Sequence, residues 1–497
     1  MFTEDFVNTL PMESSLTPAV GRAPAQAPAG GAPLQHSLQK THPLEGCSHE
    51  LGFSQVQLSG GLPEYPVSER EQWFARAAAV MPYGVSSNFR YWGDADTMIV
   101  RKAHGAYLWD VDGKKYIDYR LGFGPVILGH AFPAVTQAVA EAMTDGNTFA
   151  LTNIYEVQAA ERFVRMTNTD MVRWTNSGAE STLHAIRVAR AHTNRDKLIK
   201  FEGSYHGAHD YVMWSTPNAP LSALGSAKAP RAIASSSGIP NALNGMTLTL
   251  PYNDFEMLEK TVKDKHGDIA AIIVEPIMGN LAATMPAKGW LQHIRKLCDE
   301  YGIVMILDEV KTGFRIAPGG AQQFFGVKAD LVTYAKAMGN GFPIGAIAGK
   351  REFMMTIQPG AVGQGGTYCG NVVSAAACDA TLRFMEDNDV FGVLTTRGTQ
   401  LMVGIHETLT RHQITHAITG VPSLFGVLIG TETPLADYRA SKRVDDVLSR
   451  KINNGLRAQG VLVEPDYQEP WFLSYSHSER DVDETLEIFE RVVASLK

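Results

Sequence analysis

Five short, almost continuously apolar runs alternate with helical patterns between residues 126 and 372, and this alternation constrains the fold most strongly. The runs cover residues 171–175, 198–201, 270–274, 304–307 and 331–334. Apolar strands of this length are typical of a parallel sheet that helices cover on both faces. Residues 179–192 and 290–301, which lie between runs, have helical spacing. The sequence therefore predicts an α/β fold with a mostly parallel central sheet in a large domain.

The segments on either side of this alternating region have a different pattern. A β-hairpin is predicted around the Asp112-Gly113 turn, because alternating apolar residues flank it. After the alternating region come helices and short strands without another βαβ series. We expect residues 126–372 to form the large domain, and residues 66–125 and 373–497 to form a smaller α+β domain together.

Residues 1–65 differ in composition from the rest of the chain. The stretch 23–33 contains only Ala, Pro, Gly and Gln, and such a segment cannot bury much apolar surface. We expect residues 1–65 to be a disordered low-complexity leader. A plain linker or a short docking segment stays open, while acidic residues such as Glu4 and Glu13 argue against a transit peptide.

Charge and composition exclude several classes of protein. The 497 residues carry a formal net charge of −8 and form no basic stripe, so nucleic acid is not an expected partner. No run approaches 18 apolar residues, and no secretory signal is recognisable, so no membrane association is predicted. The four cysteines lack CxxC spacing, which favours a reducing, cytoplasmic location, and no metal site is predicted.

Two of the apolar runs end in a charged residue. Asp308 follows the run at 304–307, and Lys336 closely follows the run at 331–334. The carboxyl ends of parallel strands share the edge at which open α/β sheets bind ligands. An acid can pair with a pyridinium nitrogen, and a desolvated lysine with a lowered pKa can form an imine. A buried salt bridge and a surface lysine are the alternatives for each residue alone, but the pair indicates pyridoxal 5'-phosphate (PLP) chemistry.

A second candidate feature is the start of a helix directly after the first run. Ser177 has the position of an N-cap, and Glu180 has the spacing of a capping box. The free N–H groups of Gly178 and Ala179 would then suit a phosphate. An ordinary capped helix is the alternative.

Single residues that follow other strands complete the candidate site. Tyr205, with His206 beside it, could stack on a flat cofactor ring. Asn280 could hydrogen-bond a cofactor or substrate oxygen, and Thr367 lies in a Gly-rich turn whose hydroxyl could donate to a phosphate. Core, turn and loop roles stay open for these residues.

Taken in order, these segments resemble the class III aminotransferases of PLP fold type I, and most of all the glutamate-1-semialdehyde aminomutase branch. The matching motifs lie at residues 176–180, 200–207, 274–276, 307–315 and 366–371, within a resemblance that extends over about residues 80–490. The resemblance implies that Lys336 forms the Schiff base and shuttles the proton. It also implies that Asp308 pairs with the ring nitrogen, that Tyr205 stacks on the ring and that residues 177–179 hold the phosphate.

The resemblance further implies substrate contacts and a shared site. Thr367 would reach the phosphate of a neighbouring subunit in a homodimer, and Asn280 would lie near the cofactor. Arg90 would bind a substrate carboxylate, since a guanidinium grips a carboxylate through two hydrogen bonds. Glu469 would lie near Arg90 and the substrate amine. A structural salt bridge is the alternative for both residues.

Several positions depart from the aminomutase pattern on the expected substrate side. Gly363 replaces a tyrosine, Phe123 a tryptophan, Asn218 a serine and Val372 a proline, and residues 211–249 differ from the branch's gating loop. The departures favour an aminotransferase that takes an amino group from an amino acid or carboxylate-bearing amine to a keto or aldehyde acceptor. A glutamate-1-semialdehyde-type 2,1-aminomutase is the main alternative, and a non-catalytic binding or scaffold relative is a further one.

Overall fold

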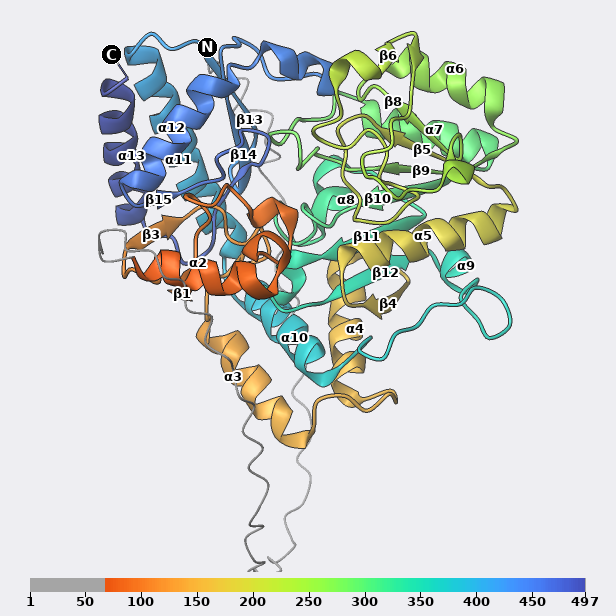
Figure 1. Cartoon of the computed structure of the whole chain (residues 1–497). Helices are drawn as coiled ribbons and strands as arrows, with labels where there is room; N and C mark the ends of the chain where they lie inside the picture. Colours follow the sequence, from red (N-terminus) through yellow and green to blue (C-terminus); the bar gives the residue numbers. More distant parts are fainter. Residues whose placement is uncertain (1–67, 497) are drawn as a thin grey trace, which may run out of the picture. The chain divides into compact units, whose positions relative to one another are not determined.

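A seven-stranded sheet with the order β4-β12-β11-β10-β9-β5-β8 lies at the centre of the computed structural model, which describes residues 68–496 (Figure 1). The strands are β4 (Met171–Thr175), β5 (Lys197–Phe201), β8 (Thr247–Leu250), β9 (Ile269–Val274), β10 (Val304–Asp308), β11 (Leu331–Ala335) and β12 (Gly345–Gly349). The neighbours β9, β10 and β11 are parallel, whereas β12 is antiparallel to both β11 and β4. The predicted α/β fold with a mostly parallel sheet is confirmed.

The five predicted strands all belong to this sheet. The bounds of β4 are those predicted, and the other four differ from the prediction by one residue at one end. The sequence pattern does not predict β8 and β12. β12 consists of Gly and Ala residues around a single Ile347, and a Cβ atom on Gly345 would come within 2.6 Å of Thr175 Oγ1 on β4, so the strand depends on close packing with its neighbours.

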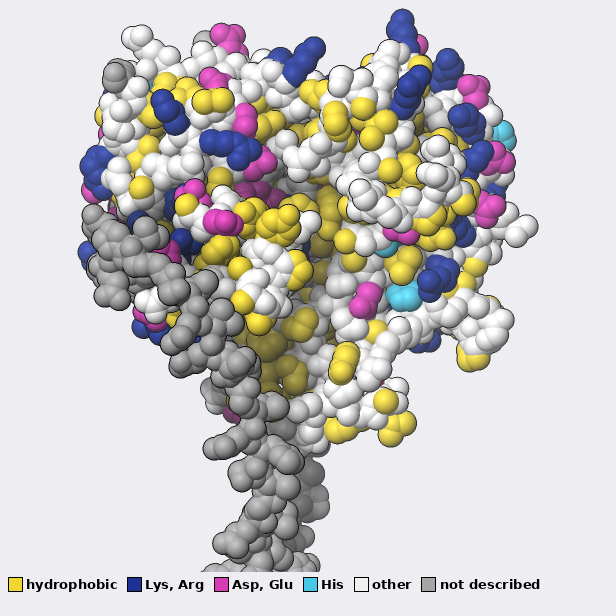
Figure 2. Space-filling view, viewed as in Figure 1, with side chains coloured by type: hydrophobic (Ala, Val, Ile, Leu, Met, Phe, Trp, Pro, Cys, Tyr) yellow, Lys and Arg dark blue, Asp and Glu magenta, His cyan; other side chains and the backbone are white. Residues whose placement is uncertain are grey.

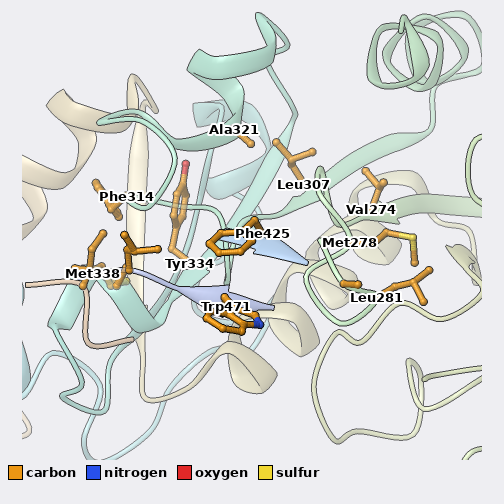
Figure 3. Close-up of a cluster of buried hydrophobic side chains, with 14 of the residues drawn as sticks. Val274, Met278, Leu281, Leu307, Phe314, Ala321, Tyr334, Met338, Phe425 and Trp471 are labelled. Atoms are coloured by element: carbon orange, nitrogen blue, oxygen red, sulfur yellow. The ribbon is translucent and has the colours of Figure 1, made fainter. Parts of the chain in front are cut away.

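Both faces of the sheet are buried, which explains the continuous apolar runs. Along β10, Val304 and Ile306 pack in a cluster with residues of helix α5 (Gly178–Thr193). The alternate residues Met305 and Leu307 belong to the larger core cluster on the other face, part of which Figure 3 shows. Helix α7 (Trp290–Tyr301), whose bounds are those predicted, packs against β9 and β10 and contributes to the larger cluster.

The other helices are distributed over the described chain from residue 69 to residue 494. They are α2 (Glu69–Val80), α3 (Pro133–Ala142), α4 (Ile154–Thr167), α6 (Phe255–Lys265), α8 (Gly320–Phe325), α9 (Arg351–Met354), α10 (Val372–Asp387), α11 (Val390–Arg411), α12 (Asp446–Ala458) and α13 (Glu479–Ala494). Helix α10 packs against α3 and α4, and α11 packs against α13. Within the described residues, no helix is long and apolar enough to cross a membrane.

Smaller sheets join segments that are far apart in the sequence. The strands are β1 (Val100–His104), β2 (Tyr107–Asp110), β3 (Lys115–Asp118), β6 (Gly225–Ser226), β7 (Ala229–Pro230), β13 (His416–Val421), β14 (Leu424–Ile429), β15 (Val461–Leu462) and β16 (Trp471–Phe472). The predicted hairpin corresponds to β2 and β3, and β15 pairs with β3, so one sheet contains both N-terminal and C-terminal strands. A second sheet has the order β13-β14-β16, and β6 pairs with β7.

The predicted domain boundaries stay predictions. All described residues belong to one compact unit, and no division of this unit near residues 125 or 372 is established. The expected disordered leader, residues 1–65, lies outside the described residues.

Candidate active site

The acid and the lysine that end two apolar runs lie on neighbouring strands. Asp308 is the last residue of β10 and lies opposite Thr333 of β11, whose hydroxyl donates a hydrogen bond to Asp308 Oδ1 at 3.2 Å. Lys336 follows β11 directly and begins a single 3₁₀ turn, Lys336–Gly339. Its backbone φ of +52° lies in the left-handed region. Residues other than glycine rarely adopt this conformation, and those that do are often found at functional sites.

Asp308 is held from two further directions. Its side chain is 4% exposed; Oδ1 accepts a hydrogen bond from the Val310 N–H at 3.0 Å, and Oδ2 lies 2.6 Å from His206 Nδ1. The other ring nitrogen of His206, Nε2, is buried and has no hydrogen-bond partner in the described part of the chain. The carboxylate is therefore fixed in direction by groups from β11, from its own loop and from the loop after β5.

The amine of Lys336 occupies an environment that favours its neutral form. Burial lowers its pKa to about 7, and the nearby ammonium of Lys311 acts in the same direction. Glu469, Glu275 and Asp308 oppose this shift. Because a lysine must be neutral to attack a carbonyl, Lys336 is prepared for imine formation near neutral pH.

The start of helix α5 lies against the same group of loops. A Cβ atom on Gly178 would lie 2.9 Å from both methyl groups of Val310, which follows β10. A Cβ atom on Gly207 would lie 2.6 Å from the Ala179 Cα atom. The two glycines therefore let the first turn of α5 pack closely against the Asp308 loop and the Tyr205–Gly207 loop.

The predicted cap at this helix is confirmed, but the predicted capping box is wrong. The Ser177 hydroxyl accepts a hydrogen bond from the Glu180 N–H at 3.2 Å. The Glu180 carboxylate reaches the N–H of Asn176 at 2.8 Å instead of the N–H of Ser177. The other N–H groups of the first turn and the positive end of the helix dipole suit a phosphate.

A buried acid that the sequence analysis did not assign to the site connects two of its loops. Glu275 follows β9, and its Oε1 accepts a hydrogen bond from the Tyr205 N–H at 2.9 Å. Its Oε2 accepts hydrogen bonds from the Gly279 N–H at 2.9 Å and the Asn280 amide at 3.3 Å. An acid at the end of an apolar strand, the signal that identified Asp308, could have identified Glu275 too.

Aromatic side chains surround Tyr205, the residue predicted to stack on the cofactor ring. The ring of Phe89 lies edge-on to Tyr205, with centroids 5.7 Å apart, and also near Phe123 at 6.3 Å. Arg120, which the sequence analysis missed, lies with its guanidinium 4.1 Å above the Phe123 ring and donates to the Phe89 carbonyl at 3.1 Å. The face in Figure 2 is hollowed beside the segment that contains α2, and hydrophobic side chains predominate in the hollow.

Three further residues predicted for the site are Arg90, Glu469 and Thr367, and none of them has the partner that was expected for it within the described residues. Arg90 is exposed at the end of a 3₁₀ turn, Asn88–Arg90, and forms no ion pair within residues 68–496. Both carboxylate oxygens of Glu469 bond to Lys311, which sequence reasoning missed, and none of its hydrogen bonds there goes to Arg90. Thr367 is exposed in the wall of a separate surface cavity of about 710 Å³.

One predicted position is wrong. Val372 was expected on the substrate side, but it is the first residue of α10 and is completely buried in the larger core cluster. The apolar side chain therefore stabilises the start of a core helix, which is a packing role.

A lysine with a lowered pKa, a held carboxylate at the end of the adjacent strand and a helix start that suits an anion are the arrangement of a PLP-dependent enzyme of fold type I. The chain belongs to the family Aminotransferase class-III, whose family model matches residues 91–493. The cofactor is therefore PLP, and the donors present fit its charged groups, with N–H groups for the phosphate and a carboxylate for the ring nitrogen.

Curated relatives extend the comparison over nearly the whole length of those proteins. The chain is 42% identical over 429 residues to glutamate-1-semialdehyde 2,1-aminomutase of Methanothermobacter thermautotrophicus, which covers 86% of this chain and 99% of the relative. The protein of the same name from Desulfatibacillum aliphaticivorans is 39% identical over 434 residues, with coverages of 86% and 100%.

Solved structures show the same fold. An omega-transaminase from Sphaerobacter thermophilus has a TM-score of 0.81 at 30% identity, covering 86% of this chain and 98% of that chain. A transaminase with PLP bound has a TM-score of 0.77 at 29% identity, with coverages of 86% and 97%.

Proposed function

We propose that the chain is a 2,1-aminomutase of the glutamate-1-semialdehyde type, which moves an amino group between adjacent carbons of one substrate. The observation that carries this proposal is the 42% identity to an aminomutase of that name over 99% of its length, together with Lys336 and Asp308 on neighbouring strands. The sequence pattern favours an aminotransferase, with the aminomutase as the main alternative. The named relatives favour the alternative.

The roles proposed for the residues follow from their chemistry. When bound, PLP supplies a carbonyl that accepts an amino group and a ring that withdraws electrons. Lys336 would hold the cofactor through its Nζ. Once the substrate amine has displaced it, its free amine would take the proton from the substrate carbon that bears the amino group and deliver it to the cofactor carbon bound to that nitrogen. Asp308 keeps the ring nitrogen protonated, Tyr205 packs on the ring, and residues 177–179 bind the phosphate.

Cofactor and substrate contacts complete the proposal. His206 positions Asp308, and Asn280, which Glu275 orients, approaches the cofactor from the loop after β9. Arg90 binds the substrate carboxylate, and Phe123 forms an apolar wall beside Phe89. Glu469 lies near the substrate amine, held by the ammonium of Lys311.

The test is to supply glutamate 1-semialdehyde to the PLP-loaded enzyme without any second keto acid. We expect the isomer 5-amino-4-oxopentanoate to form, and the K336A variant to form none above the uncatalysed rate. Product that forms only when pyruvate or 2-oxoglutarate and an amine donor are supplied would instead establish an aminotransferase.

An aminotransferase is the second candidate function, because two residues differ from the aminomutase pattern. Gly363 and Phe123 depart from the aminomutase pattern, and the omega-transaminase of Sphaerobacter thermophilus has a similar fold at 30% identity. A panel of amino acids and amines, each offered with pyruvate or 2-oxoglutarate, measures this activity directly. A non-catalytic role is disfavoured because Lys336 and Asp308 are both retained.

We also propose a homodimer with shared active sites. The exposed apolar side chains of Phe149, Leu151 and Val157 line the same cavity as Thr367, and Ile154 and Tyr368, which are sequence neighbours of cavity-lining residues, are exposed as well. Such a patch is typical of a protein interface. If Thr367 completes the partner's site, mixing inactive K336A subunits with impaired T367A subunits restores one intact site per mixed dimer. A monomer by analytical ultracentrifugation would contradict the proposal.

A further inference from the structure

Lys311 forms an ion pair with Glu469 that is largely shielded from solvent. Its ammonium donates to Glu469 Oε1 at 2.8 Å, to Glu469 Oε2 at 2.9 Å and to the Gly279 carbonyl at 2.7 Å. The two side chains are 6% and 12% exposed. Three charge-assisted hydrogen bonds of normal length hold the ammonium, and contact with both oxygens fixes the orientation of the carboxylate.

The backbone leaves room for this lysine. A Cβ atom on Gly279 would lie only 2.3 Å from the Lys311 Cδ atom. The stem of the lysine therefore crosses the loop after β9 at a position that only glycine can occupy. Beyond the loop, the ammonium lies 5.7 Å from the centre of the Phe472 ring. The ion pair is thus enclosed by three separate segments of the chain.

The pair lies at the same edge of the sheet as the amine that forms the imine, because Lys311 comes three residues after Asp308, the last residue of β10, and Lys336 follows the neighbouring strand β11. The charged groups around Lys336 are Lys311, Glu469, Glu275 and Asp308. The Lys311 cation lowers the pKa of Lys336, whereas the Glu469 anion raises it. The two members of the ion pair therefore shift the pKa of the same nitrogen in opposite directions.

Lys311 is the cation that offsets the charge of Glu469. The two other acids of the same segment, Glu464 and Asp466, have their own partners in Arg120 and Arg450. Burial raises the pKa of both acids, and repulsion by the Glu469 carboxylate adds to this rise. Without Lys311, Glu469 would be an unpaired buried anion among other acids.

We propose that Lys311 is a positioning residue that fixes the Glu469 carboxylate beside Lys336 and offsets its charge, so that the imine nitrogen faces a neutral pair. The inference rests on the lysine imine with PLP. This inference applies equally to an aminomutase and to an aminotransferase.

The test is an absorbance titration of the PLP-loaded enzyme against pH, because the protonated and unprotonated imine absorb at different wavelengths. K311M leaves the anion unpaired, and we expect it to raise the apparent pKa of the imine. E469Q leaves the cation unpaired, and we expect it to lower that pKa. Each shift should be roughly one pH unit, and the K311M/E469Q double variant should return toward the wild-type value.

Two further variants separate charge from packing. K328M removes an exposed lysine and should leave the imine pKa unchanged. K311Q keeps an N–H donor but loses the charge, and it should shift the pKa in the same direction as K311M. Shifts of equal sign in K311M and E469Q, no shift in either variant, or a wild-type value in K311Q would overturn the proposal. The absence of any imine absorbance in the wild type would contradict the cofactor assignment instead.

Discussion

The Nδ1 atom of His206 lies 2.6 Å from the Oδ2 atom of Asp308, so a ring from the loop after β5 holds the carboxylate that ends β10. This contact joins two strand ends that are 102 positions apart in the sequence. It explains how a buried carboxylate keeps one direction while its other oxygen accepts hydrogen bonds from Thr333 and Val310.

Replacing Asp308 with Asn should remove the negative charge and keep the shape. Because an amide cannot hold a pyridinium nitrogen protonated, we expect kcat to fall by about 10²–10³-fold, the scale of losing one preorganised electrostatic contact. H206N should cause a smaller loss, since it acts only through the orientation of Asp308. Steady-state kinetics with matched PLP content would measure both. A D308N variant with kcat within threefold of the wild type would contradict the assignment.

The rate at which the apoenzyme takes up PLP should depend on the protonation of Lys336. Its pKa is lowered to about 7, so the reactive neutral amine increases as pH rises through 7 and is nearly complete above about pH 8. Stopped-flow absorbance should therefore show a rate that levels off there. A rate that continues to increase toward pH 10, as for an ordinary lysine, would refute the lowered pKa.

The contact between Gly178 and Val310 should control cofactor affinity. G178A places a Cβ atom 2.9 Å from the Val310 methyl groups and would force the start of α5 away from the Asp308 loop. We expect the Kd for PLP to rise by about tenfold or more. V310A should restore part of the affinity in the double variant, whereas G267A, which meets no atom within 4 Å, should be neutral. Equal affinities for G178A and G267A would exclude this packing role.

Glu275 should contribute to stability as well as to site geometry. E275A leaves the N–H groups of Tyr205 and Gly279 without their acceptor in a buried region, so we expect a loss of about 2–4 kcal/mol in the free energy of unfolding. E275Q keeps one acceptor oxygen and should lose less. Urea denaturation of the apoenzyme measures these values, with the exposed Glu432→Ala as control. If E275A and E432A unfold alike, the network is unimportant.

The sequence predicted the elements whose signal is local. The runs that became β9, β10 and β11 are apolar because both faces of the sheet are buried there, and the charged residues Glu275, Asp308 and Lys336 are visible where these runs end. β12 was not predicted because four of its five residues are Gly or Ala, which have low strand propensity, and its strand conformation comes from pairing with β11 and β4.

Contacts between residues that are far apart in the sequence could not be predicted from it. Lys311 and Glu469 are 158 positions apart, and neither residue type indicates its partner. Glu180 has the spacing of a capping box with Ser177, yet its carboxylate accepts a hydrogen bond from the N–H of Asn176, the preceding residue. Such contacts depend on loop geometry, which a pattern of residue types does not specify.

The central claim is that Lys336 forms the imine with PLP, and borohydride reduction followed by peptide mapping tests it most directly. Reduction converts the imine into a stable secondary amine and leaves the cofactor attached to the lysine that held it. We expect the mass increase on the peptide that contains Lys336, and no attached cofactor in K336A. Attachment to another lysine of the wild type, or a reducible imine in K336A, would contradict the account.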